Sequence, residues 1–217
     1  MALAIFDLDE TLIDGDCASL WSAYMAKLGW VDGESFLQRD SELMALYSQG
    51  LLAMEDYMTF SLSPLVGRSA EEVAHVIEPF VEDIIEPLIY SDACQCLAKH
   101  RAAGDRLLVI SASGVHLVAP IAARLGISEV LAIDLEEQHG SYSGNTVGIL
   151  TYRAGKVQRL QAWLSEQGES LEGAYFYSDS RNDLPLLSLV SQPRVVNPDA
   201  TLKAHAEQAG WPILNWR

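Results

Sequence analysis

The stretch Leu3-Ala4-Ile5-Phe6-Asp7-Leu8-Asp9 near the N-terminus decides the fold class. Its apolar run over residues 3–6 is short and unbroken, and two aspartates follow it almost at once. An unbroken apolar run of this length is typical of a strand that is buried on both faces, as in a parallel sheet. We therefore expect a buried strand over residues 3–6 that ends in an acidic turn.

Further along the chain, other apolar runs have the same form and also end in polar residues. They cover residues 107–110, 174–177 and 194–196, and helical patterns over 115–125, 156–164 and 202–209 separate them. This alternation predicts an α/β fold with a doubly wound, mainly parallel, Rossmann-like sheet. The stretch 130–148 contains three turn-forming residues and is expected to form a strand followed by a hairpin.

The segment between the first two strands has a different pattern. Residues 16–87 show no convincing strand, and helical patterns cover 19–28, 34–47, 55–62 and 70–85. About 70 helical residues are far more than a simple crossover between parallel strands requires. We expect a small all-helical cap over residues 16–85, inserted after the first strand, and an α/β core formed by residues 1–15 and 86–217. Helical spacing predicts that Trp21 and Tyr24 pack inside this cap.

The amino-acid composition limits the binding partners and the cellular compartment to expect for this protein. The 217 residues include 30 acidic and 14 basic side chains, for a net charge of −16, which argues against a nucleic acid or an anionic membrane as partner. Cys17, Cys94 and Cys96 are too few and too badly spaced for a zinc site or a disulfide framework, and they fit a reducing compartment. No stretch reads as a membrane span or a signal peptide, so a cytoplasmic location is expected. The oligomeric state stays open.

Polar groups gather where the predicted strands end. Asp7 and Asp9 follow the first strand, Ser111 follows the second, and Asp179 and Asp183 follow the third. Ligands of open parallel sheets bind beyond the carboxyl ends of the strands. Separate segments therefore deliver groups suited to an anion or a metal to one crevice.

Each group also has a simpler interpretation. Asp7 and Asp9 could be a nucleophile and a proton carrier, or an ordinary acidic turn. Ser111 could help to hold an anion at the start of the next helix, or could belong to its N-cap. Lys156, in the first turn of a helix, opposes the helix dipole and could meet a phosphate, or could be a solvated surface lysine. Asp179 could bind Mg²⁺, or could cap a helix together with its neighbours.

Taken together, the four segments resemble the motifs of the haloacid dehalogenase-like phosphohydrolases. Phe6-Asp7-Leu8-Asp9-Glu10-Thr11-Leu12 is similar to the first motif and Val109-Ile110-Ser111-Ala112-Ser113 to the second. Lys156 is similar to the third, and Tyr177-Ser178-Asp179-Ser180-Arg181-Asn182-Asp183 to the fourth. All four occur in the family's order. The helical insertion after the first motif resembles the cap of the phosphoserine-phosphatase-like branch.

The resemblance implies a role for the acidic residues. Asp7 would be the nucleophile that forms an aspartyl-phosphate, and Asp9 the general acid and later the base that activates water. Mg²⁺ would be held by the Asp7 carboxylate, the backbone carbonyl of Asp9 and Asp179. Asp183 would orient Lys156 or a metal-bound water.

The resemblance also implies which residues bind the substrate. Ser111 and Lys156 would hold the transferring phosphoryl group, and Asn182 would assist. Ala112 and Ser113 would form part of the phosphate cradle, and Asp16 would face the rest of the substrate.

The position of Asp9, two residues after the nucleophile, resembles the pattern of phosphatases and phosphomutases in the superfamily. The helical cap favours a phosphatase, because phosphomutases usually carry a different cap. The sequence thus indicates a Mg²⁺-dependent phosphomonoesterase that acts on a small phosphorylated metabolite. The alternatives are a phosphotransferase or phosphomutase with the same nucleophile, a receiver-like phospho-aspartate signalling protein, and a scaffold-only relative. Receivers are much shorter and lack a helical cap, and every chemical group of the motifs is present.

Two positions that differ from phosphoserine phosphatases limit the choice of substrate. Asp16 is the shorter counterpart of an acidic residue in phosphoserine phosphatases, and Ser61 stands where those enzymes carry a carboxylate-binding arginine. An arginine fork is the natural partner of a carboxylate, whereas Asp16 suits an ammonium. An amino-alcohol phosphate such as histidinol phosphate is therefore favoured over phosphoserine. Whether Arg68 or Arg153 contacts the substrate stays open.

Overall fold

A computed structural model describes residues 2–217, so that Met1 of the predicted core lies outside the described residues. The described residues form one seven-stranded sheet in the order β4-β3-β2-β1-β5-β6-β7, and within it β4 alone runs antiparallel to its neighbour. The predicted doubly wound, mainly parallel sheet is confirmed. The strands are β1 Leu3–Phe6, β2 Arg106–Gly114, β3 Glu129–Gln138, β4 Ser141–Val147, β5 Tyr175–Ser178, β6 Gln192–Val196 and β7 Ile213–Leu214.

The first strand lies in the middle of the sheet, between β2 and β5. All four of its residues are buried, as its unbroken apolar run predicts. Ala4 and Phe6 face one core cluster, whereas Leu3 and Ile5 face the other, because successive side chains of a strand point to opposite faces. Both faces of the sheet are therefore covered.

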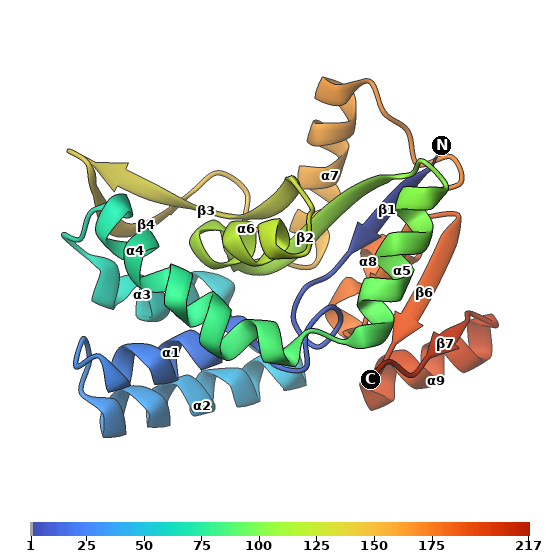
Figure 1. Cartoon of the computed structure of the whole chain (residues 1–217). Helices are drawn as coiled ribbons and strands as arrows, with labels where there is room; N and C mark the ends of the chain where they lie inside the picture. The colour runs from blue at the N-terminus through green and yellow to red at the C-terminus, as the bar shows by residue number, and fades with distance from the viewer. Residues whose placement is uncertain (1) are drawn as a thin grey trace.

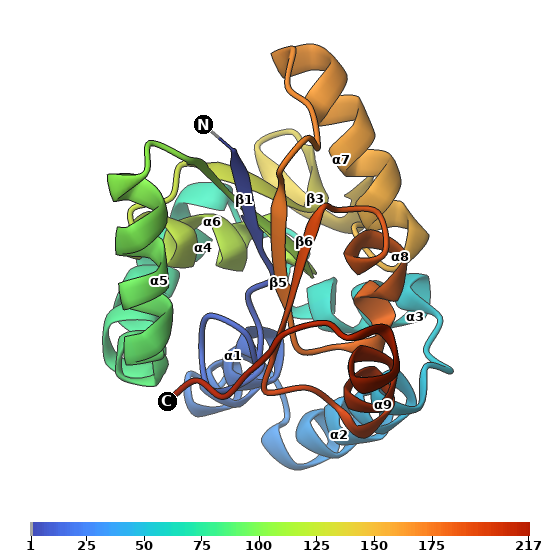
Figure 2. The ribbon, with the colours of Figure 1, turned by 90° about the vertical axis from the view of Figure 1, so that its right-hand side faces the viewer.

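Helices cover both faces of the sheet (Figure 2). The helices α5 (Ser91–Ala102) and α6 (Val115–Arg124) contribute to the cluster that holds Phe6, and α7 (Ala154–Gln167), α8 (Leu184–Leu187) and α9 (Ala200–Ala209) to the cluster that holds Ile5. The helix α5 was not predicted from the sequence. The others overlap predicted helices, apart from the short α8.

The segment between β1 and β2 is helical, as predicted. Before α5 it contains α1 Cys17–Lys27, α2 Gly33–Gln49, α3 Met54–Leu62 and α4 Ala70–Phe80. The single helix expected over 70–85 is instead α4 followed by a wider π-helical turn at Val81–Ile85, next to Pro79, which has no N–H to donate. Trp21 and Tyr24 stack on each other with ring centroids 5.8 Å apart, so their predicted packing within the cap is confirmed.

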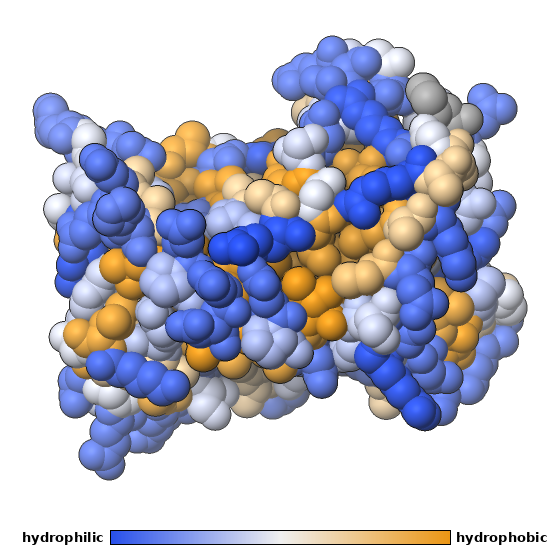
Figure 3. Space-filling model, viewed as in Figure 1, coloured by the Kyte–Doolittle hydropathy of each residue, from blue (hydrophilic) through white to orange (hydrophobic). Residues whose placement is uncertain are grey.

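The cap segment, residues 16–85, lies beyond the carboxyl end of β1 (Figures 1 and 2). The predicted hairpin, β3–β4, extends beside it, and the Gly67 N–H donates to the Tyr142 carbonyl at 3.0 Å while the Tyr142 N–H donates to the Arg68 carbonyl at 2.9 Å. The hairpin thus ties the cap segment to the core. On the face that Figure 3 shows, hydrophobic residues lie among hydrophilic ones. None of the helices formed by residues 2–217 is long and apolar enough to cross a bilayer.

Candidate active site

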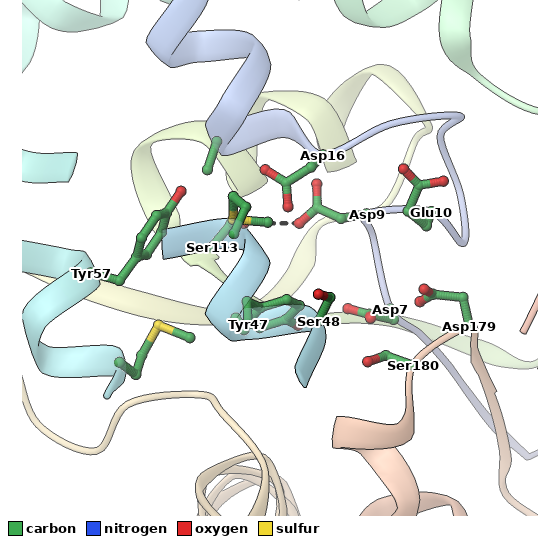
Figure 4. A pocket seen from close by; sticks show the side chains of 14 residues that line it. Asp7, Asp9, Glu10, Asp16, Tyr47, Ser48, Tyr57, Ser113, Asp179 and Ser180 are labelled. Atoms are coloured by element: carbon green, nitrogen blue, oxygen red, sulfur yellow. Dashed lines mark hydrogen bonds between the residues drawn. The ribbon is translucent and has the colours of Figure 1, made fainter. Parts of the chain in front are cut away.

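A cavity of about 180 Å³ lies between the carboxyl ends of β1, β2 and β5 and the cap segment (Figure 4). The predicted crevice is thus present, and both parts of the chain form its walls. The core contributes Asp7, Asp9, Glu10, Ala112, Ser113, Asp179 and Ser180, and the cap segment contributes Asp16, Ala18, Met44, Tyr47, Ser48, Met54 and Tyr57.

Asp7 is the first residue past β1, and hydrogen bonds hold both its backbone and its carboxylate. Its N–H donates to the Tyr177 carbonyl at 2.9 Å, which continues the pairing of β1 with β5. Its Oδ1 accepts from the Leu8 N–H at 2.9 Å and from Lys156 Nζ at 3.0 Å. These bonds fix one carboxylate oxygen, and none of the described residues donates to Oδ2, which leaves that oxygen available to a ligand.

Lys156 is a buried residue, only 2% exposed, so the interpretation as a solvated surface lysine is wrong. Its Nζ lies 3.0 Å from Asp7 Oδ1 and 2.8 Å from Asp183 Oδ2, and Ser178 Oγ donates to the same Asp183 oxygen at 2.8 Å. Burial alone would lower the pKa of Lys156, but the Asp183 and Asp7 carboxylates raise it above its ordinary value. The ammonium therefore stays charged beneath the cavity.

The first turn of α7 lies very close to the backbone of the loop that precedes it. A Cβ on Gly155 would lie 1.9 Å from the Leu150 carbonyl oxygen, and Arg153 has a positive φ of 51°. Glycine is the residue type that tolerates such a close backbone approach. Gly155 therefore permits the first turn of α7 to pack against the Leu150 carbonyl, one residue before Lys156.

Asp9 is held by donors from the cap segment and from β2. Its Oδ1 accepts from the Cys17 N–H at 2.7 Å, and its Oδ2 accepts from Ser113 Oγ at 2.8 Å and from Ser111 Oγ at 3.5 Å. The N-cap residue of α6 is Gly114, so Ser111 is not its N-cap. Ser111 lies where the regular pairing of β2 with β3 breaks after Ile110, and this irregularity turns the segment toward Asp9.

Asp179 lies beside Asp7 at the end of β5 and accepts a hydrogen bond from Thr11 Oγ1 at 3.1 Å. Thr11 is fully buried. The predicted cap of the next turn is made by Ser180, whose Oγ accepts from the Asn182 N–H at 3.2 Å, and not by Asp179. The Asp179 carboxylate therefore faces the cavity rather than the helix.

The carboxylates outnumber the positive charges at this end of the cavity. Burial raises the pKa of Asp7, Lys156 opposes this, and Asp183 and Asp179 raise it further. Burial and then Asp183 likewise raise the pKa of Asp179. Two neighbouring carboxylates with raised pKa values, of which only Asp7 contacts the Lys156 ammonium, fit a site that a divalent cation completes.

The donor set also fits Mg²⁺ in number. Among residues 2–217, no group of three or more His, Cys, Asp or Glu side chains surrounds one point. Mg²⁺ commonly takes one or two protein carboxylates and keeps several waters, so Asp7 and Asp179 with a backbone carbonyl would suffice.

Asp16 brings a carboxylate from the cap segment to the same cavity (Figure 4). It caps α1, and its Oδ1 accepts from the Ser19 N–H at 2.8 Å. Burial and then the Asp9 carboxylate raise the pKa of Asp16 to about 7. A cationic group beside Asp16 would relieve this repulsion and keep the carboxylate charged.

Neither Arg68 nor Arg153, the two arginines considered as substrate contacts, lines the cavity. Arg68 lies 3.8 Å from the centre of the Trp30 ring and pairs with Glu72. Arg153 donates to Asn182 Oδ1 at 3.1 Å and to a backbone carbonyl of the cap segment. Asn182 is buried behind Ser180 and borders a separate hollow with Arg153, so its predicted contact with the phosphate stays a prediction.

Sequence reasoning missed the aromatic and thioether wall of the cap segment, Met44, Tyr47, Met54 and Tyr57. Helical patterns mark these residues as apolar, and nothing in the spacing distinguishes a side chain that lines a cavity from one that packs in a core. Thr11 and Ser178 could have been found, because each stands within or next to an acidic motif.

Comparison with known proteins agrees with this geometry. A family model for haloacid dehalogenase-like hydrolases matches residues 4–188. The chain belongs to this family. The predicted phosphatase assignment is confirmed at the level of the family, whose members similar to this chain include several named as phosphatases.

Two relatives of this hydrolase have names that specify different substrates. A protein of Neisseria meningitidis serogroup C (strain 8013), named histidinol-phosphatase, is 40% identical over 219 residues that cover 99% of both chains. Phosphoserine phosphatase SerB1 of Mycobacterium tuberculosis (strain ATCC 25618 / H37Rv) is 30% identical, across 100% of this chain and 71% of that protein.

Solved structures confirm the fold. A protein of unknown function from Bordetella pertussis Tohama I has a TM-score of 0.92 and 36% identity, and the match covers 98% of this hydrolase and 97% of that chain. A phosphoserine phosphatase captured as an analogue of its phospho-aspartyl intermediate has a TM-score of 0.71 and 20% identity, with 98% and 92% covered. The latter similarity shows the shared fold.

Proposed function

We propose that this hydrolase is a Mg²⁺-dependent phosphomonoesterase that hydrolyses a small amino-alcohol phosphate through an aspartyl-phosphate, with histidinol phosphate as the leading candidate substrate. One observation carries the proposal. The cavity that holds Asp7 has Asp16 on its cap wall, and none of the described residues that line it is an arginine or a lysine.

The core residues suit the two chemical steps. An oxygen of the Asp7 carboxylate forms a bond to phosphorus as the bond to the leaving alkoxide breaks, and Asp9 gives that alkoxide its proton. In the second step Asp9 takes a proton from a water, whose oxygen bonds to phosphorus as the bond between phosphorus and the Asp7 oxygen breaks; phosphate leaves and the Asp7 carboxylate is restored. Lys156 neutralises charge beside Asp7, and Asp183 holds the ammonium in place at 2.8 Å.

Ser111, Ala112 and Ser113 follow the irregularity in β2 and lie close to Asp9, where the phosphoryl oxygens would sit. Asp7, Asp179 and the backbone carbonyl of Asp9 would hold Mg²⁺, which would supply charge neutralisation for the phosphoryl group. Without the cation, several carboxylates would repel the phosphate. We therefore expect phosphate esters to bind weakly in its absence.

The cap segment supports the choice of substrate. A phosphoserine would bring a carboxylate against Asp16 without a cationic partner, whereas an amino alcohol would bring only an ammonium. An ammonium beside a partly buried carboxylate makes a charge-assisted hydrogen bond, which is stronger than a neutral one. The name of the Neisseria relative agrees with this preference. We propose that residues 16–85 act as the specificity-determining cap of a core formed by 1–15 and 86–217.

The direct test measures free phosphate released from histidinol phosphate, phosphoethanolamine, phosphoserine and p-nitrophenyl phosphate, with Mg²⁺ and with EDTA. We expect turnover only with Mg²⁺ and a preference for the amino-alcohol phosphates. A clear preference for phosphoserine would contradict the substrate assignment. Phosphate that passes to an added alcohol instead of to water would indicate a phosphotransferase.

Variants separate the chemical roles. Asp7→Asn should abolish turnover of every ester, because an amide is a poor nucleophile, and Asp9→Asn should lower it by about 10²- to 10⁴-fold. Asp16→Asn keeps a residue type that caps helices, so α1 should remain intact. It should raise KM for histidinol phosphate about 10- to 100-fold and leave p-nitrophenyl phosphate nearly unchanged. Substantial turnover by Asp7→Asn would refute the assigned nucleophile.

A further inference from the structure

A second, smaller hollow adjoins the main cavity on the side of the cap segment. It shares Ala18, Tyr57 and Ser113 with that cavity and is otherwise lined by residues of α1, α3 and the start of α6. Its volume is about 10 Å³, room for about one water molecule or the tip of one polar group. The hollow is therefore an extension of the substrate cavity rather than a separate site.

Buried polar atoms without partners gather at this hollow. Five buried side-chain polar atoms among the described residues have no hydrogen-bond partner, and three of them, Trp21 Nε1, Tyr57 Oη and His116 Nδ1, belong to residues that line it. Trp21 is 2% exposed and Tyr57 is 5% exposed. Leaving buried polar groups unpaired costs free energy, so their concentration at one place points to a missing ligand atom.

The three groups suit a neutral partner. The indole N–H of Trp21 only donates, whereas the Tyr57 hydroxyl donates or accepts. Burial lowers the pKa of His116 to about 3, which keeps its imidazole neutral, with one nitrogen that accepts and one that donates. The buried Asp40 behind the hollow is already engaged by the hydroxyls of Ser19 and Ser22, at 2.8 and 3.1 Å.

The order of groups along the cavity matches an extended substrate. In Figure 4, Asp7 and Asp179 lie at one end, Asp9 and Asp16 in the middle, and Tyr57 at the other end. A phosphate on Asp7 and an ammonium on Asp16 would direct the remainder of the substrate toward Tyr57.

We propose that Trp21 and Tyr57, backed by His116, form a specificity subsite that hydrogen-bonds a neutral, nitrogen-bearing ring at the far end of the substrate. The inference rests on the proposed function and deepens it. An imidazole suits the subsite because one ring nitrogen can enter the small hollow, either as an acceptor for the Trp21 N–H or as a donor to the Tyr57 hydroxyl, while the rest of the ring stays in the main cavity, which Tyr57 also lines. An aliphatic or phenyl end group would leave these atoms unpaired.

The test uses two amino alcohols that share the ammonium and differ in the ring, histidinol and phenylalaninol. Each is titrated as an inhibitor of Mg²⁺-dependent p-nitrophenyl phosphate hydrolysis, at about pH 8, where the histidinol ring is neutral. The enzymes compared are the wild type, Tyr57→Phe and, as a matched control, Tyr24→Phe, whose ring stacks on Trp21 and lines neither hollow.

We expect wild type to bind histidinol more tightly than phenylalaninol. Tyr57→Phe should weaken histidinol about 2- to 10-fold, as the loss of one neutral hydrogen bond would, and should leave phenylalaninol unchanged. Its unfolding temperature should equal or exceed that of the wild type, because the removed hydroxyl has no partner in the free protein. Tyr24→Phe should bind both compounds as the wild type does.

Two outcomes would overturn the subsite and can be told apart. If both amino alcohols inhibit equally in the wild type and in Tyr57→Phe, and Asp16→Asn weakens both, the unpartnered atoms hold only a structural water and the proposed substrate class stands. If neither compound inhibits while p-nitrophenyl phosphate is hydrolysed, both the subsite and the amino-alcohol assignment are wrong.

Discussion

Replacing Lys156 with methionine tests whether the buried ammonium holds the acidic centre together. Its side chain is 3% exposed and lies 3.0 Å from Asp7 and 2.8 Å from Asp183, whose side chains are 9% and 2% exposed. Methionine keeps the apolar length and removes the charge, which leaves two carboxylates buried without their cation. Removing one partner of a buried ion pair costs about 3–5 kcal/mol. For a chain of this size that is a drop in unfolding temperature of about 6–20 °C.

The loss should depend on pH in a defined direction. Burial already raises the pKa of Asp7 above its unfolded value, and Lys156 opposes that rise. Without the lysine, the folded-state pKa rises further, so the folded protein binds more protons than the unfolded chain. Stability of the variant then increases as pH falls. The deficit should be largest near pH 8 and should shrink toward about pH 5.

The assay is thermal unfolding in EDTA from about pH 5 to pH 8, with Lys203→Met as the matched control. Lys203 is exposed and takes part in none of the ion pairs between described residues, so its replacement should change stability by less than about 0.5 kcal/mol at every pH. If Lys156→Met unfolds at the temperature of this control at pH 8, or if acid fails to reduce its deficit, the reasoning from buried charge is refuted.

Two further predictions concern the cation and the loop. Burial raises the folded-state pKa of Asp7 and Asp179, so the metal-free protein should lose stability as pH rises from about 5 to 8. The stabilisation by Mg²⁺, measured by thermal unfolding, should grow over the same range. A Mg²⁺ effect that does not depend on pH would contradict this prediction. Gly155→Ala should lower the free energy of unfolding in urea by at least about 1–3 kcal/mol, because its Cβ would lie 1.9 Å from the Leu150 carbonyl oxygen. Gly33→Ala, whose Cβ would make an ordinary 3.4 Å contact, should be nearly neutral. Equal effects of the two substitutions would show that the loop before α7 moves freely.

The helix α5 shows where sequence patterns failed. Its buried residues are Ala93, Leu97 and His100, so one of three inward positions carries a polar ring. His100 is accommodated because its ring nitrogens lie 2.8 Å from Asp105 and 2.9 Å from the Tyr177 hydroxyl, which belongs to a distant strand. A histidine facing inward breaks the apolar periodicity, and its partners become known only once the sheet is assembled.

The residues of the predicted crevice could be found from the sequence because each lies near the carboxyl end of a buried strand. Parallel strands bring their carboxyl ends to one edge, so Asp7, Asp9, Ser111 and Asp179 had to meet once the sheet was assigned. For Lys156 the sequence left two interpretations open, since a lysine in a first helical turn is usually solvated. The tertiary structure decides between them, because it places Lys156 Nζ 3.0 Å from Asp7 and 2.8 Å from Asp183 in the interior.

The sequence by itself therefore determined the sheet, the order of its motifs and the acidic centre, because these depend on local apolar runs and on the residues directly after them. The tertiary structure alone decided which cap side chains face that centre. Helical periodicity marks Trp21 and Tyr57 as inward-facing, but only the packing of the cap against β2 and α6 leaves their polar atoms unpaired at the far end of the cavity. The charge of −16 likewise says little about the site, where Lys156 and a divalent cation would set the local field.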